Sequence, residues 1–175
     1  VLLGACRGLC FRLEQTRDVA LGWRGNVDDF SARCTPDETP PPEVAPGYGY
    51  EAVAVGTEDF DCDGSRVHLR VSPAARIEID FPSKIVVWEN HALVVTGDDG
   101  HGRKLDLGEG YTYTTAGVVQ YASCGDMDLL CGLAGPATPP LVAKTTGRGA
   151  ITASFLGLTA TRDVTAIARP DAGAD

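Results

Sequence analysis

The most regular alternation of apolar and polar residues lies near the C-terminal end, in residues 141–168 (LVAKTTGRGAITASFLGLTATRDVTAIA). Ile151, Ala153 and Phe155 alternate there with Thr152, Ser154 and Leu156, and Gly157 interrupts the run. Alternation with a period of two places one side of a strand on a core and the other side in water. The stretch therefore predicts three short strands, with glycine-containing turns between them.

The same alternation recurs through the rest of the chain. In the first half, Val19, Leu21 and Trp23 alternate, and Trp23 is expected to point inward with its large apolar ring. Strands are predicted at residues 18–25, 29–34, 50–61 and 66–71, and then at 77–79, 85–87, 93–95, 105–107, 111–114 and 118–121. Residues 35–49 are rich in proline and are expected to form a surface loop, and residues 105–107 a short edge strand.

A short segment, Ser-Pro-Ala-Ala at residues 72–75, separates the two halves of this pattern. It is too short for a flexible linker and contains Pro73, so we expect a fixed, end-to-end arrangement of two domains. The predicted fold is all-β, with two tandem β-sandwich domains at residues 11–75 and 76–169. Residues 1–10 form an N-terminal segment, and residues 170–175 are predicted to be a disordered tail.

Composition supports this interpretation. The chain has 175 residues, of which 43% are hydrophobic, and its 21 glycines and 11 prolines favour many short strands over long helices. A net charge of −9 argues against a nucleic-acid partner, because phosphate binding depends on clustered lysine and arginine. No apolar run reaches the roughly 18 residues of a transmembrane helix.

Six cysteines, an even number in a β-rich acidic chain, indicate disulfides and an oxidising compartment. There is no C-x-x-C pair, and the three histidines are not in ligand spacing with the cysteines, which argues against a zinc site. Cys124 and Cys131 flank the short segment GDMDLL and are expected to bond to each other. Cys6 and Cys10 lie outside both predicted domains.

The motifs of the C-terminal stretch, taken in order, resemble bacterial immunoglobulin-like domains of the intimin and invasin type. The matching positions are Val142-Ala143-Lys144, Gly147, Gly149, Ile151-Thr152-Ala153, Gly157 and Thr159-Ala160-Thr161 running into Val164. The resemblance extends upstream to about Ile77 and implies an immunoglobulin-like sandwich. Tyr113 stands where the family has a tryptophan or another aromatic residue, and the family lacks the CGDMDLLC insert.

The first half resembles small immunoglobulin-like modules of bacterial surface proteins. In these modules a V-x-L-x-W strand is followed by one cysteine, and a second cysteine precedes the last strand. Cys34 and Cys62 stand in those places, so the resemblance implies that they bond. Closing a loop of about 29 residues would stabilise the fold by roughly 3–4 kcal/mol.

The first residues contain Leu3-Gly4-Ala5-Cys6, which resembles a bacterial lipobox. The resemblance implies lipidation of Cys6 and a lipid anchor, although no basic or extended apolar region precedes it in this sequence. The alternative is a short apolar terminus.

Asp59, Asp61 and Asp63 spell D-x-D-x-D-G with Gly64, the opening of a calcium loop. An EF-hand requires glutamate at the twelfth position, where this chain has Arg70. Two interpretations remain: a calcium turn of another kind, with calcium as the one candidate cofactor, and a solvated acidic hairpin turn.

Other polar residues point to structure rather than catalysis. His68 is expected to face solvent on a strand, and His91, His101 and Asp98-Asp99-Gly100 are expected in turns. No motif of a hydrolase, metalloprotease or nucleotide-binding enzyme is present, so the chain is not expected to be an enzyme. Five tyrosines could form a sugar-binding surface or pack as core and cross-strand pairs: Tyr48, Tyr50, Tyr111, Tyr113 and Tyr121.

The resemblance and the residues together predict a non-enzymatic, secreted or cell-surface module that acts in spacing, presentation or adhesion. The expected partner is a surface protein or a carbohydrate, and the expected location is extracellular, periplasmic or anchored at the outer membrane. The alternative is a β-sandwich module that binds carbohydrate or calcium, and a third class to be tested is a hydrolase on a β-sandwich scaffold.

Overall fold

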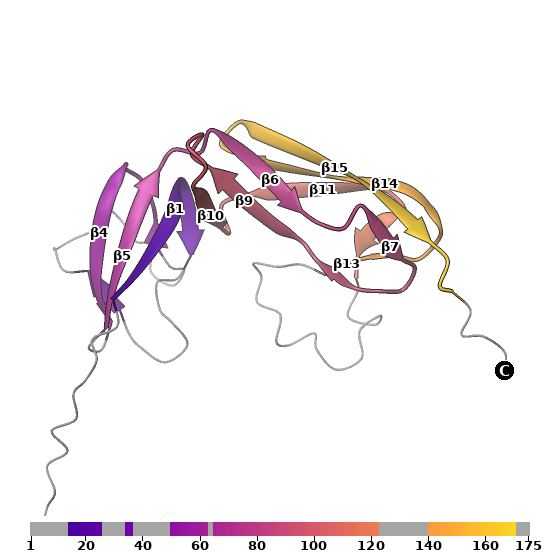
Figure 1. Cartoon of the computed structure of the whole chain (residues 1–175), viewed down its shortest axis with the longest axis horizontal. Helices are drawn as coiled ribbons and strands as arrows, with labels where there is room; N and C mark the ends of the chain where they lie inside the picture. Colours follow the sequence, from indigo (N-terminus) through magenta and orange to yellow (C-terminus); the bar gives the residue numbers. More distant parts are fainter. Residues whose placement is uncertain (1–13, 26–33, 37–49, 63–64, 123–139, 171–175) are drawn as a thin grey trace, which may run out of the picture.

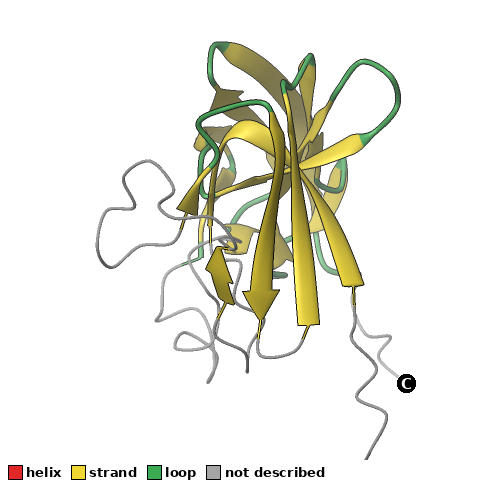
Figure 2. Cartoon of the chain, turned by 90° about the vertical axis from the view of Figure 1, so that its left-hand side faces the viewer, coloured by secondary structure: helices red, strands yellow, loops and turns green. Residues whose placement is uncertain are grey.

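The computed structural model describes residues 14–25, 34–36, 50–62, 65–122 and 140–170, which form strands and loops (Figures 1 and 2). The strands on the N-terminal side are β1 (Glu14–Gly25), β2 (Cys34–Pro36), β3 (Tyr50–Glu51), β4 (Gly56–Cys62) and β5 (Ser65–Ser72). Then come β6 (Arg76–Asp80), β7 (Lys84–Val86), β8 (His91–Ala92), β9 (Val94–Asp98), β10 (Lys104–Gly108), β11 (Thr112–Gly117), β12 (Val119–Tyr121), β13 (Pro140–Ala143), β14 (Gly147–Phe155) and β15 (Leu158–Ile167). Within these ranges no helix has the length and apolar character to cross a membrane.

The all-β prediction is confirmed. The C-terminal stretch forms the three predicted strands, β13, β14 and β15, and the last two make a hairpin that closes at Leu156 and Gly157. The predicted strand at residues 50–61 is divided into β3 and β4, and His91, predicted in a turn, opens the short strand β8. Residues 29–33, 37–49, 123–139 and the two chain ends lie outside the described residues, together with the predictions made for them.

One eight-stranded sheet draws strands from both sides of residues 72–75. Its order is β2-β4-β5-β1-β10-β9-β6, with β3 paired to β1 (Figure 1). β1 pairs in parallel with β5 on one side and with β10 on the other. The prediction that residues 105–107 form an edge strand is wrong, because β10 lies between β1 and β9. Backbone hydrogen bonds therefore join the two predicted domains.

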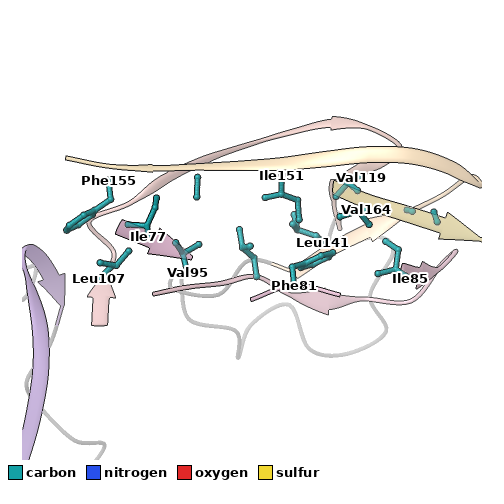
Figure 3. Close-up of a cluster of buried hydrophobic side chains, with 14 of the residues drawn as sticks. Ile77, Phe81, Ile85, Val95, Leu107, Val119, Leu141, Ile151, Phe155 and Val164 are labelled. Carbon is teal, nitrogen blue, oxygen red and sulfur yellow. The ribbon is translucent and has the colours of Figure 1, made fainter. Parts of the chain in front are cut away.

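A second layer covers only the C-terminal part of this sheet. It consists of the four-stranded sheet β11-β14-β15-β7, and a three-stranded sheet β12-β13-β8 lies beside it. Between the layers is the larger core, in which side chains from both layers meet (Figure 3). Its fully buried members include Phe81, Ile85, Leu93, Leu141 and Ile151.

A smaller core lies on the N-terminal part of the sheet, against β1, β4 and β5. Its buried members are Val19, Trp23, Phe60, Val67, Leu69 and Val71. β1 serves both cores because successive side chains point to opposite faces. Val19 and Trp23 belong to the smaller core, whereas Ala20 belongs to the larger one.

The outer faces of the two parts differ in chemistry. On the outside of β11, β14 and β15, hydroxyl side chains align in two cross-strand rows: Thr112, Ser154 and Thr159, then Thr114, Thr152 and Thr161. Thr152 and Thr161 are 3.1 Å apart between their Oγ1 atoms. Threonine is a favoured residue on exposed strands, so this neutral face needs no further partner to be stable.

Candidate functional site

The D-x-D motif lies on β4 and forms part of a charge ladder on the outer face of β4, β5 and β1. The central strand β5 carries Arg66, His68 and Arg70 on this face. Their Cα partners on the neighbouring strands are mostly acidic: Asp61 and Glu14 opposite Arg66, Asp59 opposite His68, and Asp18 opposite Arg70. Opposite charges placed directly across strands stabilise a sheet pair, so this arrangement explains why β4 is so acidic.

Two contacts of the ladder are close. Nδ1 of His68 lies 2.6 Å from Oδ1 of Asp59, and both side chains are partly exposed. Arg70 makes a two-pronged contact with Asp18, with Nε 2.5 Å from Oδ1 and Nη2 3.0 Å from Oδ2. The hydrogen bond from Arg70 lowers the pKa of Asp18 below its ordinary value of 3.8, and burial opposes this effect. His68 faces outward as predicted, but it is paired and half-buried rather than freely solvated.

The geometry of Asp59 and Asp61 bears on the calcium interpretation. Both carboxylates extend from a regular strand whose pairing partners on β5 are His68 and Arg66. Calcium prefers six to eight oxygen ligands that converge from a loop. Asp63 lies outside the described residues, and within those residues no group of three or more His, Cys, Asp or Glu side chains is placed to hold a metal.

The row that contains His68 has the residue types of a hydrolytic triad, since Asp59 lies opposite His68 on one side and Thr16 on the other. Catalysis by such a row needs a substrate pocket and donors for a developing oxyanion. The pocket described below lies on the opposite face of these strands, and Thr16 is exposed on a flat sheet surface. The ladder is therefore best explained as cross-strand pairing.

Two of the six cysteines, Cys34 and Cys62, lie on neighbouring strands of the sheet. Cys34 on β2 is the Cα partner of Cys62 on β4. Directly opposed residues of antiparallel strands have Cα atoms about 4.5–5.5 Å apart, which is within the range that a disulfide spans. The Cys34–Cys62 bond stays a prediction that this register favours. Cys6, Cys10, Cys124 and Cys131 lie outside the described residues.

The junction between the two cores depends on close backbone approach at glycines. A Cβ atom on Gly108 would lie 1.9 Å from the carbonyl oxygen of Arg24 and 2.7 Å from Nε1 of Trp23, and Gly108 has a φ of +54°. Next to it, the amide of Glu109 donates to the Arg24 carbonyl at 2.7 Å. Only glycine allows β10 to approach β1 this closely.

The β14–β15 hairpin also contacts the N-terminal part. Leu156 occupies a turn position with a φ of +46°, which is unfavourable for a residue with a side chain. A Cβ atom on Gly22 would lie 2.7 Å from Cδ1 of Leu156, so the Leu156 side chain packs directly over the β1 backbone. This contact explains why leucine occupies a position at which glycine or asparagine is usual.

Charged residues add to the junction on the outer side. Arg103 on the β9–β10 turn has Nη1 3.9 Å from Asp18 of β1, and Arg17 of β1 has Nη2 3.9 Å from Asp106 of β10. Exposed pairs at this distance contribute about 0–1 kcal/mol each. The glycine contacts and the strand pairing therefore dominate at the junction.

The β9–β10 turn is the predicted Asp98-Asp99-Gly100 turn, and this prediction is confirmed. Asp98 is buried and accepts hydrogen bonds from the Gly100 amide at 2.8 Å and from Arg76 at 3.2 Å. Asp99 accepts from the amides of His101 and Arg103. These amide donors hold the pKa of each carboxyl group below its usual value, so both act as turn caps.

A pocket of about 120 Å³ opens on the inner face of the smaller core. Its walls include the aromatic rings of Trp23, Tyr50 and Phe60, and Tyr50 meets Phe60 edge-on with ring centroids 4.9 Å apart. Two carboxylates, Glu51 and Glu58, lie among the lining residues. The one signal for this pocket in the sequence is a polar residue, Glu58, at an inward position of an alternating strand.

The tyrosines fall into two groups. Tyr50 packs against the smaller core. Tyr113, near the start of β11, contacts both Tyr111, just before that strand, and Tyr121 at the end of β12. Their ring centroids are 6.4 Å apart for Tyr111 and Tyr113 and 5.4 Å apart for Tyr113 and Tyr121. Burial raises the pKa of Tyr113 and Tyr111. Tyr121 is 55% exposed, so the group presents aromatic surface to solvent, and Tyr48 lies outside the described residues.

One exposed aromatic residue was not anticipated. Trp88 is 59% exposed in the turn after β7, with a left-handed φ of +68°. The ammonium group of Lys144 lies 5.8 Å from the centroid of the Trp88 ring. The backbone amide of Trp88 donates a hydrogen bond to the carbonyl oxygen of Ala143 at 2.9 Å. These two contacts hold a conformation that costs a tryptophan about 1 kcal/mol or more.

Comparison with known proteins gives structural matches only. No family model matches the chain, and no curated protein matches it. The chain is similar to domains 4 and 5 of the S-layer protein SbsC, at 14% identity over 69% of this chain and 70% of that chain with a TM-score of 0.39. It is also similar to invasin, a bacterial integrin-binding protein, at 14% identity over 67% of this chain with a TM-score of 0.38.

A third similar structure is the adhesin InvE of Yersinia pseudotuberculosis, at 15% identity over 85% of this chain and 56% of that chain, with a TM-score of 0.36. The chain spans 27% of the length of the invasin chain. Invasin is of the type that the sequence resemblance names. Matches at these identities and TM-scores carry no argument about this chain, so its function has to be argued from its own residues.

Proposed function

We propose that this chain is a non-enzymatic, cell-surface or secreted module that holds neighbouring parts of an assembly at a fixed spacing and presents them. The observation that supports this role is the parallel pairing of β1 with β10, which joins two separate cores into one sheet. A spacer must transmit position along its length, and hydrogen-bonded strands do this better than a flexible linker.

The second support is the junction packing around Gly108 and Gly22. At both glycines another part of the chain lies directly against the backbone, so a small rotation of one core relative to the other would cause steric clashes. The immunoglobulin-like resemblance fits the same role. Extracellular location and an anchor at Cys6 belong to the proposal on the strength of the cysteine count and the lipobox resemblance.

Small-angle X-ray scattering tests the spacing role. We expect an elongated particle whose maximum dimension does not change between low and high ionic strength, because the joint consists of backbone pairing. A maximum dimension close to that of a single compact globule of the same mass would contradict the proposal. Turnover of ester, glycoside or peptide substrates that is lost on His68→Gln would contradict the non-enzymatic part.

A second candidate function is carbohydrate binding at the group formed by Tyr111, Tyr113 and Tyr121. Adjacent, partly exposed rings offer aromatic surface to a sugar, and protonated phenols donate hydrogen bonds to it. Glycan-array binding that Tyr121→Ala abolishes, and that Tyr121→Phe weakens less, would support it. Equal binding by wild type and Tyr121→Ala would contradict it.

Calcium binding at Asp59, Asp61 and Asp63 is retained as a third proposal with a simple test. If calcium binds the folded state, millimolar calcium raises the melting temperature by mass action. An unchanged melting curve, with no heat in isothermal titration, would leave the two described aspartates as members of the charge ladder alone.

A further inference from the structure

The pocket of the smaller core lies beside an open strand edge. β4 pairs with β5 along its whole length, from Gly56 to Cys62. On its other side β2 pairs only with residues 60–62. Among the described residues, no strand pairs with that side of β4 at residues 56–59. An open edge offers backbone donors and acceptors to an added strand.

The pocket is placed to receive a side chain of such a strand. Glu58 is the Cα partner of Leu69, so it lies on the inner, apolar face, and both residues line the pocket. The volume of about 120 Å³ corresponds to about four water molecules, or to the end of one long side chain. Strand addition takes its affinity from backbone hydrogen bonds and its specificity from pockets for alternate side chains.

The charges identify the kind of strand that fits. Glu58 of β4 and Glu51 both line the pocket, and β4 has no basic residue. Asp59 and Asp61 lie on the opposite face of β4, where they oppose His68 and Arg66. Arg24 pairs with Glu51 at 3.2 Å but is itself 63% exposed. A lysine or arginine side chain could bury its apolar stem against Trp23 and Phe60 and place its charge beside Glu58.

Two other occupants fit less well. A second copy of this chain that paired through the same edge would bring acidic β4 against acidic β4, and the chain as a whole has a net charge of −9. The chain's own residues 37–49 (DETPPPEVAPGYG) contain three acidic residues and no basic one. Like charges on opposed strands are destabilising.

We propose that the edge of β4 at residues 56–59, together with the adjoining pocket, binds an extended basic peptide segment of another protein, which adds to the sheet beside β4 and places a lysine or arginine side chain in the pocket. This goes beyond the spacing role and does not depend on it, because the open edge of β4 is separated by β5 from the pairing of β1 with β10, although Trp23 borders both the pocket and that junction. The opposing explanation is that Glu58 serves only to keep other strands away from an exposed edge.

Isothermal titration with the full chain distinguishes these explanations. The probe is acetyl-Val-Lys-Val-Arg-Val-Lys-amide, and its matched control carries glutamate in place of the three basic residues. We expect the basic peptide to bind and the acidic peptide to bind several-fold more weakly, since about two charge pairs of 0.2–1 kcal/mol each, at Glu58 and Glu51, are reversed. A basic peptide with N-methyl groups on alternate backbone amides should not bind.

Two variants assign the binding to the pocket. Glu58→Gln should weaken the binding of the basic peptide by about two- to fivefold, because it removes one partly exposed charge pair. Glu89→Gln removes an exposed glutamate of the turn after β7 and should leave binding unchanged. The scattering profile of both variants should match that of the wild type, so failure here is separable from failure of the spacing role.

Several results would overturn the proposal. These are equal binding of the basic and acidic peptides, no binding of either, binding that N-methylation does not reduce, and equal effects of the two glutamate substitutions. Concentration-dependent dimerisation that Glu58→Gln strengthens would assign the edge to a second copy. Binding that appears only after residues 37–49 are replaced by a glycine–serine linker would assign it to the chain's own segment.

Discussion

The two parts of this molecule stabilise the same sheet by different means. In the C-terminal part, a second layer of strands covers the sheet, the core between them is large, and the outer face is a neutral array of threonine and serine. In the N-terminal part the core is small, a pocket opens into it, and the outer face is held by cross-strand charges.

The difference shows how a small core can be maintained. Apolar burial contributes in proportion to area, so the part with fewer buried side chains has less hydrophobic stabilisation. Cross-strand charges, the predicted disulfide and the pairing of β1 with β10 all act on that part. We therefore expect the N-terminal part to depend on its connection to the larger core, and the substitutions below measure that dependence.

The largest expected difference comes from leucine truncation in the two cores. Leu141→Ala should lower the free energy of unfolding by about 4–5 kcal/mol, because Leu141 is fully buried between two layers. Leu69→Ala should cost about 2–3 kcal/mol, because Leu69 already borders a pocket. Urea unfolding measures both, and an equal or larger cost for Leu69→Ala would contradict the comparison.

The next effect is that of the predicted disulfide between Cys34 and Cys62. The double substitution Cys34→Ser and Cys62→Ser should lower the free energy of unfolding by about 3–4 kcal/mol, since the bond restricts the unfolded chain. Peptide mapping under non-reducing conditions should recover the two cysteines in one cross-linked fragment. Recovery of both as free thiols would remove the bond from the account.

The junction is tested by a pair of glycine substitutions. Gly108→Ala should cost about 3 kcal/mol, because its Cβ would collide with the Arg24 carbonyl at a positive φ. Gly102→Ala is the control: its φ is +89°, but nothing lies within 4 Å of the added atom, so only about 1 kcal/mol of backbone strain is expected. Equal costs would show that β10 and β1 are not as close as described.

A smaller effect is expected from the charge ladder. Asp18→Asn removes the two-pronged contact with Arg70 and should cost about 1 kcal/mol, less at high salt. Thr114→Val on the neutral face should change stability by less than about 0.5 kcal/mol at any salt concentration. A salt-independent cost for Asp18→Asn would contradict a charge-based role for the ladder.

Low pH should destabilise the fold through the same residue, Asp18. The folded-state pKa of Asp18 lies below its ordinary value of 3.8, so the ionised carboxyl stabilises the fold fully above that value. This contribution should be lost as the pH falls from about 4 through the lower folded-state pKa. Stability of the wild type should therefore fall more steeply in that range than stability of Asp18→Asn, as thermal unfolding at several pH values would show.

Alternation in the sequence was enough to predict most of the described strands and several of the core residues. Val19, Trp23, Ile151 and Phe155 are buried as expected, because a period of two is a local property. The pairing of β1 with β10 was not predictable in this way. It joins residues 84–87 positions apart in parallel, and its signals, such as Gly22 and Gly108, have the appearance of ordinary turn glycines.

The candidate sites show the same limit. Asp59 and Asp61 spell the start of a metal loop, yet the identity of their neighbours is decided by the register of β5, which sets His68 and Arg66 opposite them. The tyrosine group and the pocket combine residues from several strands, so no short motif encodes either of them. Cross-strand charge alternation between β4 and β5 was the one signal that could have revealed the ladder.

The pairing of β1 with β10 should make the two cores unfold as one unit. The Trp88→Phe variant leaves Trp23, in the smaller core, as the only tryptophan. Urea unfolding of this variant should be followed by Trp23 fluorescence and by far-UV circular dichroism, which reports all strands. We expect one transition with coincident midpoints by both probes. A fluorescence transition complete before most of the circular dichroism signal is lost would show that the smaller core unfolds by itself, and would contradict the pairing of the two cores into one unit.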